Sequence, residues 1–294
     1  MDTVSPGIGI KPIIKDGVIY SDGATILGAD DKAGIAAIME ALEVILEKDI
    51  PHGDIEVAFT IHEEGGLFGA KNLDYIKLKA KSAFVLDSSK EPGEVIIQGP
   101  AQNKINAKFI GKEAHAGVAP ENGISAIQML SEAISNMKLL RIDEVTTANI
   151  GIISGGHATN IVPKEAIFKA EARSLNDYKL REQTDHMIKC CEDAANTYGR
   201  QVEVEVINSY GAFKVDEEDE VVKKVKVACS NIGLNPKVTS SGGGSDTNVI
   251  NANGITAVNL GIGERKPHTL EEHIYIKDLE NVSKLALEII KVYS

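Results

Sequence analysis

Several residue types are scarce in this sequence of 294 residues, and each scarcity excludes a class of protein. The three cysteines, Cys190, Cys191 and Cys229, form no C-x-x-C pair, which argues against a disulfide framework and against thiolate zinc sites. Lys and Arg number 31 against 43 Asp and Glu, and the net charge of −12 argues against binding to nucleic acid. No apolar run approaches the ~18 residues of a membrane span, and the first residues do not resemble a signal peptide. We therefore expect a reduced, cytoplasmic protein with no membrane or nucleic-acid partner.

The composition suits a globular protein, with 43% hydrophobic and 25% charged residues. The first part of the chain predicts βαβ units and a parallel-type sheet, because its helical and β-branched runs alternate. These runs are a helix at 32–48 and strands at 55–61 and 82–86, after a turn-rich start that predicts a loop or hairpin. Beyond Gly99, alternating strands mixed with two helices predict a compact α+β unit, and the α/β pattern returns from residue 217. We predict an α/β fold whose mixed sheet is flanked by helices, with domain segments 1–99, 100–210 and 211–294.

Acidic and histidine residues stand at or near the ends of these predicted elements. They are Asp30 and Asp31 at the start of the long helix, Glu63 and Glu64 after one strand, Asp87 at the end of the next, and His268 after the last strand. Taken singly, each has a simpler explanation, because acids cap helices and a Glu pair is usually solvated. Ligands in open α/β sheets bind at the carboxyl ends of strands, however. The joint arrangement therefore predicts a binding site.

A series of short motifs follows in order along the whole chain. They are Asp2 in 1–4, Asp30 in 27–34, Glu63 and Glu64 in 62–66, Asp87, His115 in 111–117, Asn160, Arg173 and His268. Each motif is weak alone, but their order resembles that of the M20 metallopeptidases, and the 27–34 run is most similar to the tripeptidase branch. The resemblance implies a zinc-peptidase catalytic domain interrupted by an α+β lid domain.

The resemblance also implies a role for each residue of the site. Asp30 would bridge two zinc ions, Asp87 would bind the first, Glu64 and His268 would bind the second, and Glu63 would be the general base. Carboxylates and imidazole suit zinc, and an unligated Glu beside the metals can move a proton. The implied activity is an aminopeptidase that hydrolyses short peptides with a water activated by two zinc ions.

In the lid, the resemblance assigns substrate contacts to three residues. His115 would stabilise the oxyanion, Asn160 would contact the substrate, and Arg173 would bind its carboxylate. A surface His, a turn Asn and a strand-end ion pair remain equally good explanations for them. Gly243, in the loop 241–246, would let the backbone approach the substrate. Homodimerisation through the lid is an option that the sequence leaves open.

The chain departs from the family pattern at its start. Family members carry a His-x-Asp motif whose His binds the same zinc as the Asp87 position, and Met1 stands at x. Asp2 would normally orient that His. We therefore expect an N-terminally truncated catalytic domain with one incomplete metal site and impaired activity. Two alternatives remain: an N-acyl amino-acid amidohydrolase of the same family, or an inactive chain that only binds metal or dimerises.

Overall fold

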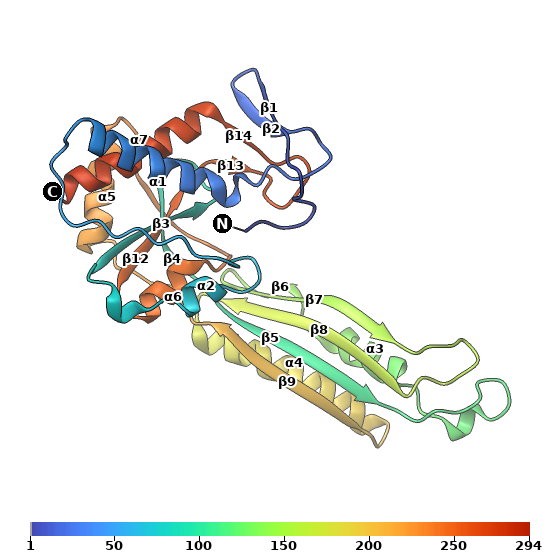
Figure 1. Cartoon of the computed structure of the whole chain (residues 1–294). Helices are drawn as coiled ribbons and strands as arrows, with labels where there is room; N and C mark the ends of the chain where they lie inside the picture. Colours follow the sequence, from blue (N-terminus) through green and yellow to red (C-terminus); the bar gives the residue numbers. More distant parts are fainter. Residues whose placement is uncertain (1) are drawn as a thin grey trace. The chain divides into compact units, whose positions relative to one another are not determined.

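The computed structural model describes residues 2–294, which form two compact units. The first unit consists of the chain up to Gly99 together with Phe213–Ser294, and the second is Pro100–Ala212 (Figure 1). The second joint lies two residues beyond the predicted boundary at 210. Along residues 2–294, no helix is both long and apolar enough to cross a membrane.

The first unit is built on a five-stranded mixed sheet. Its strands are β3 (Ser82–Ser88), β4 (Glu94–Gly99), β10 (Phe213–Lys214), β11 (Lys237–Ser240) and β12 (Thr256–Gly261). The order is β10-β4-β12-β3, with β11 also paired to β4. β12 runs parallel to β3 and antiparallel to β4, so the predicted mixed sheet is confirmed. β12 is buried along nearly its whole length, as expected for a central strand covered on both faces.

Helices pack against this sheet and enclose the core. They are α1 (Ala29–Glu47), α2 (Phe68–Lys71), α5 (Glu220–Asn231), α6 (Asp246–Ala252) and α7 (Ile276–Val292), with a 3-10 turn at Tyr75–Lys77. α1 is rich in Ala, Leu and Glu, which favours a helix. Its buried residues Ala33, Ala37 and Ala41 recur every four positions. α1 and α7 belong to the same hydrophobic core, to which α7 contributes Leu285 and Ile289.

A second, four-stranded antiparallel sheet carries the loops of the candidate site. Its order is β1 (Pro12–Lys15), β2 (Val18–Ser21), β14 (His273–Tyr275) and β13 (Glu264–Arg265). Asp16 and Gly17 join β1 to β2 with φ values of 52° and 77°, as a two-residue hairpin turn requires. The pairing of β14 with β2 brings the end of the sequence beside its start.

The predicted strand at 55–61 is wrong, because this segment has no regular structure. Its polar groups find other partners: the Glu56 carboxylate accepts the N–H of Lys79 and Ala80, and the Ile61 carbonyl accepts the N–H of Gly69. Among the described residues, β3 pairs with β12 and has no strand on its other edge. β-branched composition alone does not provide a pairing partner, which is why the sequence signal misled.

The second unit is an antiparallel sheet with two long helices. The sheet has the order β6 (Leu140–Arg141), β7 (Thr146–Gly155), β8 (Glu165–Ser174), β5 (Ala101–Ile110) and β9 (Gln201–Tyr210). The helices α3 (Ala126–Asn136) and α4 (Asp177–Thr197) are capped by Ser125 and Asn176. β8 alternates buried and more exposed residues, and Phe168 packs in a core with Phe109 and Met187.

Candidate metal centre and active site

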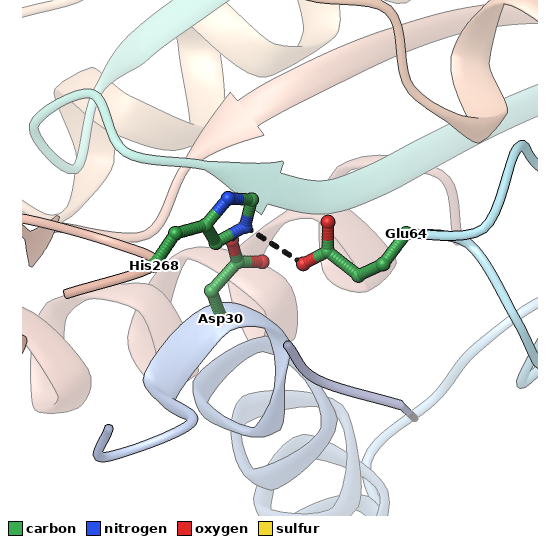
Figure 2. Close-up of side chains that lie close together, drawn as sticks. All are labelled: Asp30, Glu64 and His268. Carbon is green, nitrogen blue, oxygen red and sulfur yellow. Dashed lines mark hydrogen bonds and ion pairs between the residues drawn. The ribbon is translucent and has the colours of Figure 1, made fainter. Parts of the chain in front are cut away.

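Three side chains from distant parts of the sequence meet in the first unit. Asp30 stands at the start of α1, Glu64 follows the irregular segment, and His268 lies in the loop between β13 and β14. His268 Nε2 lies 2.8 Å from Glu64 Oε1 and 3.2 Å from Asp30 Oδ2 (Figure 2). One ligand atom from each residue lies within 4.8 Å of the other two.

This donor set fits a zinc ion. Two carboxylates and one imidazole are ligands that zinc accepts, and three protein ligands are typical of a catalytic zinc with an open position. Zinc–ligand distances of about 2.0–2.2 Å place neighbouring ligand atoms roughly 3–4 Å apart. The spacing of Asp30, Glu64 and His268 therefore needs little adjustment to hold an ion.

Asp87 and Glu63 lie around the same cavity, which has a volume of about 280 Å³ and is also lined by Asp2, Asp30 and Glu64. Asp87 is fixed through its backbone: its N–H donates to Asn259 Oδ1 at 3.1 Å, and its carbonyl accepts from Asn259 Nδ2 at 3.0 Å. The Glu63 N–H donates to Asp2 Oδ1 at 3.0 Å. Asp87 is not one of the three residues whose ligand atoms converge.

Burial and mutual repulsion shift the pKa of these carboxyl groups. Burial, followed by the charges of Asp246 and Glu64, raises the pKa of Glu63 to about 8. Burial and the charge of Asp30 raise the pKa of Glu64, while His268 opposes this shift. Burial acts likewise on Asp87, whose pKa is raised well above its ordinary value. Burial favours a higher pKa for Asp2 too, but backbone hydrogen bonds, the first from Glu63, outweigh it and lower the pKa.

These shifts are a second observation in favour of a bound cation. Buried carboxylates that lie close together repel one another, so their charged forms are disfavoured and their pKa values rise. A divalent ion is often the largest charge in such a site and reverses this effect, because it favours ionised ligands. The electrostatics thus agree with the donor set.

Glu272 holds the loop that leads into Asp30, a role that the sequence did not indicate. Its side chain is 1% exposed. Oε2 accepts the N–H of Leu27 at 3.0 Å and of Gly28 at 2.9 Å, and Oε1 accepts the N–H of Asp30 at 3.1 Å. Nothing in the sequence distinguishes Glu272 from its exposed neighbour Glu271.

Asn259 and Glu264 are further residues that sequence reasoning missed. Besides its bonds to Asp87, Asn259 Nδ2 donates to Ser245 Oγ at 3.2 Å, which ties the end of β3 to the start of α6. Glu264 is 2% exposed, and burial, followed by the charge of Asp30, raises its pKa to about 8. Local sequence patterns do not reveal Asn259 and Glu264, because the roles of these two residues depend on contacts with distant parts of the chain.

Two of the residues predicted to bind substrate in the second unit lie in exposed loops that meet. His115 Nδ1 accepts the N–H of Gly117 at 3.2 Å and of Val118 at 3.1 Å. The carbonyl of Asn160 accepts the N–H of Ala116 at 2.9 Å, so the loops of His115 and Asn160 touch. Both side chains belong to exposed residues.

Arg173 lies at the other end of the same sheet. It is opposite Gln102 on β5, whereas His115 follows Ile110 at the far end of that strand. Gln102 and Ile110 are eight residues apart, or roughly 26 Å at ~3.3 Å per residue. A tripeptide spans at most ~11 Å, so within one chain it cannot contact both Arg173 and His115.

Arg173 already has a partner in the structure. Its Nε donates to Glu171 Oε1 at 2.9 Å and its Nη2 to Glu171 Oε2 at 3.0 Å, which is the ion pair considered as the alternative. Gly243 lies in an exposed loop, and its N–H donates to Ser241 Oγ at 3.0 Å. A Cβ at Gly243 would meet no atom closer than 3.7 Å, so packing does not require glycine there.

Comparison with known proteins identifies the family. The model of peptidase family M20/M25/M40 matches residues 1–292. The uncharacterized protein YqjE of Bacillus subtilis is 47% identical over 291 residues, which are 99% of this chain and 78% of that protein. The crystal structure of aminopeptidase PepT from Bacillus cereus is 49% identical, with a TM-score of 0.89, and a tripeptidase from Staphylococcus aureus is 48% identical, with a TM-score of 0.95. In both structures the match covers 99% of this chain and 78% of the other. The predicted resemblance is confirmed: the chain is similar to a PepT aminopeptidase and a tripeptidase, belongs to peptidase family M20/M25/M40, and is a metallopeptidase.

Proposed function

We propose that this metallopeptidase is an aminopeptidase that hydrolyses short peptides, tripeptides among them, and that Asp30, Glu64 and His268 hold a zinc ion. The convergence of these three side chains carries the proposal. The names of the relatives at 48–49% identity, an aminopeptidase and a tripeptidase, support the substrate class.

The role of each residue follows from its chemistry. Asp30, Glu64 and His268 would hold the zinc ion, which would supply a Lewis acid and lower the pKa of a bound water molecule. Glu63 stands next to a ligand without being one of the three, and burial raises the pKa of its carboxyl group, so the carboxylate binds a proton more readily than an exposed glutamate does. Glu63 would accept the proton of the attacking water and deliver it to the departing amine. Asp2 helps to fix Glu63, because the Asp2 carboxylate accepts a hydrogen bond from the backbone N–H of Glu63.

We also propose a second, weaker metal position that shares Asp30 and uses Asp87. Asp30 and Asp87 line one cavity, but together they offer two ligands where three are usual. We therefore expect about one tightly held zinc ion per 294-residue chain, and a turnover below that of a dinuclear enzyme.

The test is a pair of substitutions at the adjacent glutamates. Glu63→Gln should keep the zinc content and lower tripeptide hydrolysis by about 10²–10⁴-fold, the usual cost of losing a general base. Glu64→Gln should lose the zinc itself, because a ligand is weakened. Zinc is measured by elemental analysis after dialysis, and hydrolysis by the release of the N-terminal amino acid. Loss of zinc in Glu63→Gln with retention in Glu64→Gln would show that the two roles are reversed.

For self-association, we propose the second unit as the contact. Among residues 2–294, no strand pairs with the outer side of residues 149–155 of β7, and Ile152 and Ile153 are 55% and 59% exposed. Open strand edges and exposed aliphatic residues favour pairing with another chain. Light scattering should show a dimer that Ile153→Lys disrupts; an unchanged mass would argue against this edge.

A further inference from the structure

Asp246, in the first unit, is a buried acid that its own helix does not use. It is the first residue of α6, but Ser245 already caps this helix. Ser245 Oγ accepts the N–H of Thr247 at 3.3 Å, and Asn248 Oδ1 accepts the N–H of Ser245 at 3.1 Å. The carboxylate of Asp246 is therefore free of the usual capping role, although its residue is only 7% exposed.

One oxygen of this carboxylate has a hydrogen bond and the other has none. Asp246 Oδ2 accepts from Thr60 Oγ1 at 2.5 Å. Asp246 Oδ1 is enclosed and has no hydrogen-bond partner, and no Lys, Arg or His among residues 2–294 forms an ion pair with the carboxylate. An enclosed carboxylate is costly unless a cation or several donors contact it. Among residues 2–294, Asp246 therefore has no cationic side chain to compensate its buried charge.

The cavity that Asp246 lines indicates what kind of partner fits. The same cavity is lined by Glu63 and by Tyr75, whose hydroxyl is also enclosed and has no hydrogen-bond partner in the described part of the chain. Burial, followed by the charge of Asp246, raises the pKa of Tyr75 to about 12, so the phenol is neutral and able to accept a hydrogen bond. Much of the remaining lining is aliphatic and includes Ile250 and Ile255. The cavity thus combines two oxygen acceptors with an apolar wall.

An ammonium group fits this combination better than a metal ion does. A metal site needs three or more good ligands, and the group of His, Cys, Asp and Glu side chains found close enough within residues 2–294 is Asp30, Glu64 and His268. An ammonium group has three N–H donors and forms strong hydrogen bonds with a carboxylate. The aliphatic wall of the cavity can contact the carbon atoms of the molecule to which the ammonium group belongs.

We propose that Asp246 binds the free α-ammonium group of the peptide's N-terminal residue, with the Tyr75 hydroxyl as a second acceptor and the aliphatic wall against its side chain. The inference rests on the proposed peptidase function, because Asp246 shares its cavity with the proposed base Glu63. Binding the amine there would fix the position of the substrate from its N-terminal end. Substrates with a blocked N-terminus would be excluded, since an acylated amine carries no charge.

Calorimetric titration with leucinamide and N-acetyl-leucinamide tests this site directly. Both probes lack a carboxylate, and the chain is first dialysed against a chelator so that the amine cannot bind a metal. The wild-type chain should bind leucinamide and discriminate against the acetylated probe. Asp246→Asn should raise the Kd for leucinamide by about tenfold or more, because a charge-assisted hydrogen bond is lost. Tyr75→Phe should raise it less, by about threefold.

The exposed Glu217, which pairs with Lys226, provides the matched control: Glu217→Gln should leave the Kd unchanged. Equal affinity for the two probes, or an unchanged Kd in folded Asp246→Asn, would overturn the assignment. Should Asp246→Asn fail to fold, as judged by circular dichroism, an unchanged Kd in Tyr75→Phe together with poor discrimination between the probes would overturn it instead. If the chain selects leucinamide but hydrolyses no tripeptide, the proposed function fails and the ammonium site stands. If it hydrolyses free and N-acetylated tripeptides equally well, the metallopeptidase activity stands, but the ammonium site fails.

Discussion

Replacing Glu272 by Gln removes the charge that organises the loop before Asp30 while keeping the shape of the side chain. The carboxylate accepts three backbone N–H groups, from Leu27, Gly28 and Asp30. A Gln side chain has one carbonyl oxygen, which can keep the two bonds made by Oε2. Its amide NH₂ then faces the Asp30 N–H, so two donors meet and the third bond is lost.

The expected loss of stability can be estimated from these contacts. A hydrogen bond to a charged group contributes about 1.5–3 kcal/mol, and a buried N–H left without an acceptor costs about 1–3 kcal/mol. We therefore expect Glu272→Gln to lower the free energy of unfolding by about 2–3 kcal/mol. The same change should weaken zinc binding, because Asp30 would no longer be held in its ligating position.

Urea unfolding and a zinc titration measure the two effects, and Glu271→Gln is the control. Glu271 is the sequence neighbour of Glu272, but its side chain is exposed and contacts Lys266. An exposed pair contributes little, so this control should change the stability by less than about 1 kcal/mol. If Glu272→Gln matched Glu271→Gln in both measurements, the reasoning on the loop would be refuted.

Two further predictions concern the substrate and pH. If Arg173 binds the substrate carboxylate, as the sequence predicts, Arg173→Ala should raise KM for tripeptides with a free carboxylate at least about tenfold, and much less for amidated ones. Equal effects in steady-state assays would leave Arg173 as a structural partner of Glu171. Burial and the charge of Asp30 raise the pKa of Glu264 from 4.5 to about 8, so the folded chain keeps a proton that the unfolded chain releases. The contribution of Glu264 to stability is therefore fully present below pH 4.5 and is lost as the pH rises to about 8. Metal-free Glu264→Gln should lose less stability between pH 5 and 8 than the wild-type chain, in urea titrations at both values; an identical loss would contradict this assignment.

Local patterns in the sequence predicted the long helices and most of the longer strands, but missed α6 and most of the short strands. The run at 32–48, rich in Ala, Leu, Ile and Glu, corresponds to α1, which begins three residues earlier, at Ala29. The alternating strands predicted beyond Gly99 include β8 (Glu165–Ser174). Such elements follow from propensity and periodicity, which act over a few residues. The strand predicted at 55–61 did not form, because a strand also needs a partner that composition does not specify.

In the candidate site, too, the sequence predicted some features and missed others. Positions at the ends of elements predicted one joint site of Asp30, Asp31, Glu63, Glu64, Asp87 and His268. The structure brings ligand atoms of Asp30, Glu64 and His268 within 4.8 Å of one another, and Asp87 is not among them. Spacing along the chain could not reveal that His115 and Arg173 lie at opposite ends of one strand pair, because both are simply loop and strand residues in the sequence. Nor could it separate Glu272 from Glu271. Contacts between distant segments decide these points, and a single sequence does not encode them in a readable pattern.

The bond between Glu272 and Asp30 has a consequence for synthesis on the ribosome, because 242 residues separate the two. The second unit, Pro100–Ala212, emerges before Phe213–Ser294, which completes the first unit. At ~5–20 residues per second, translating 213–294 takes roughly 4–16 s. During this time α1 lacks the partner helix α7, and the loop of Asp30 lacks its anchor. We expect Pro100–Ala212 to fold first. The segment before it stays unfolded, and open to chaperones and proteases, until Glu272 has been added.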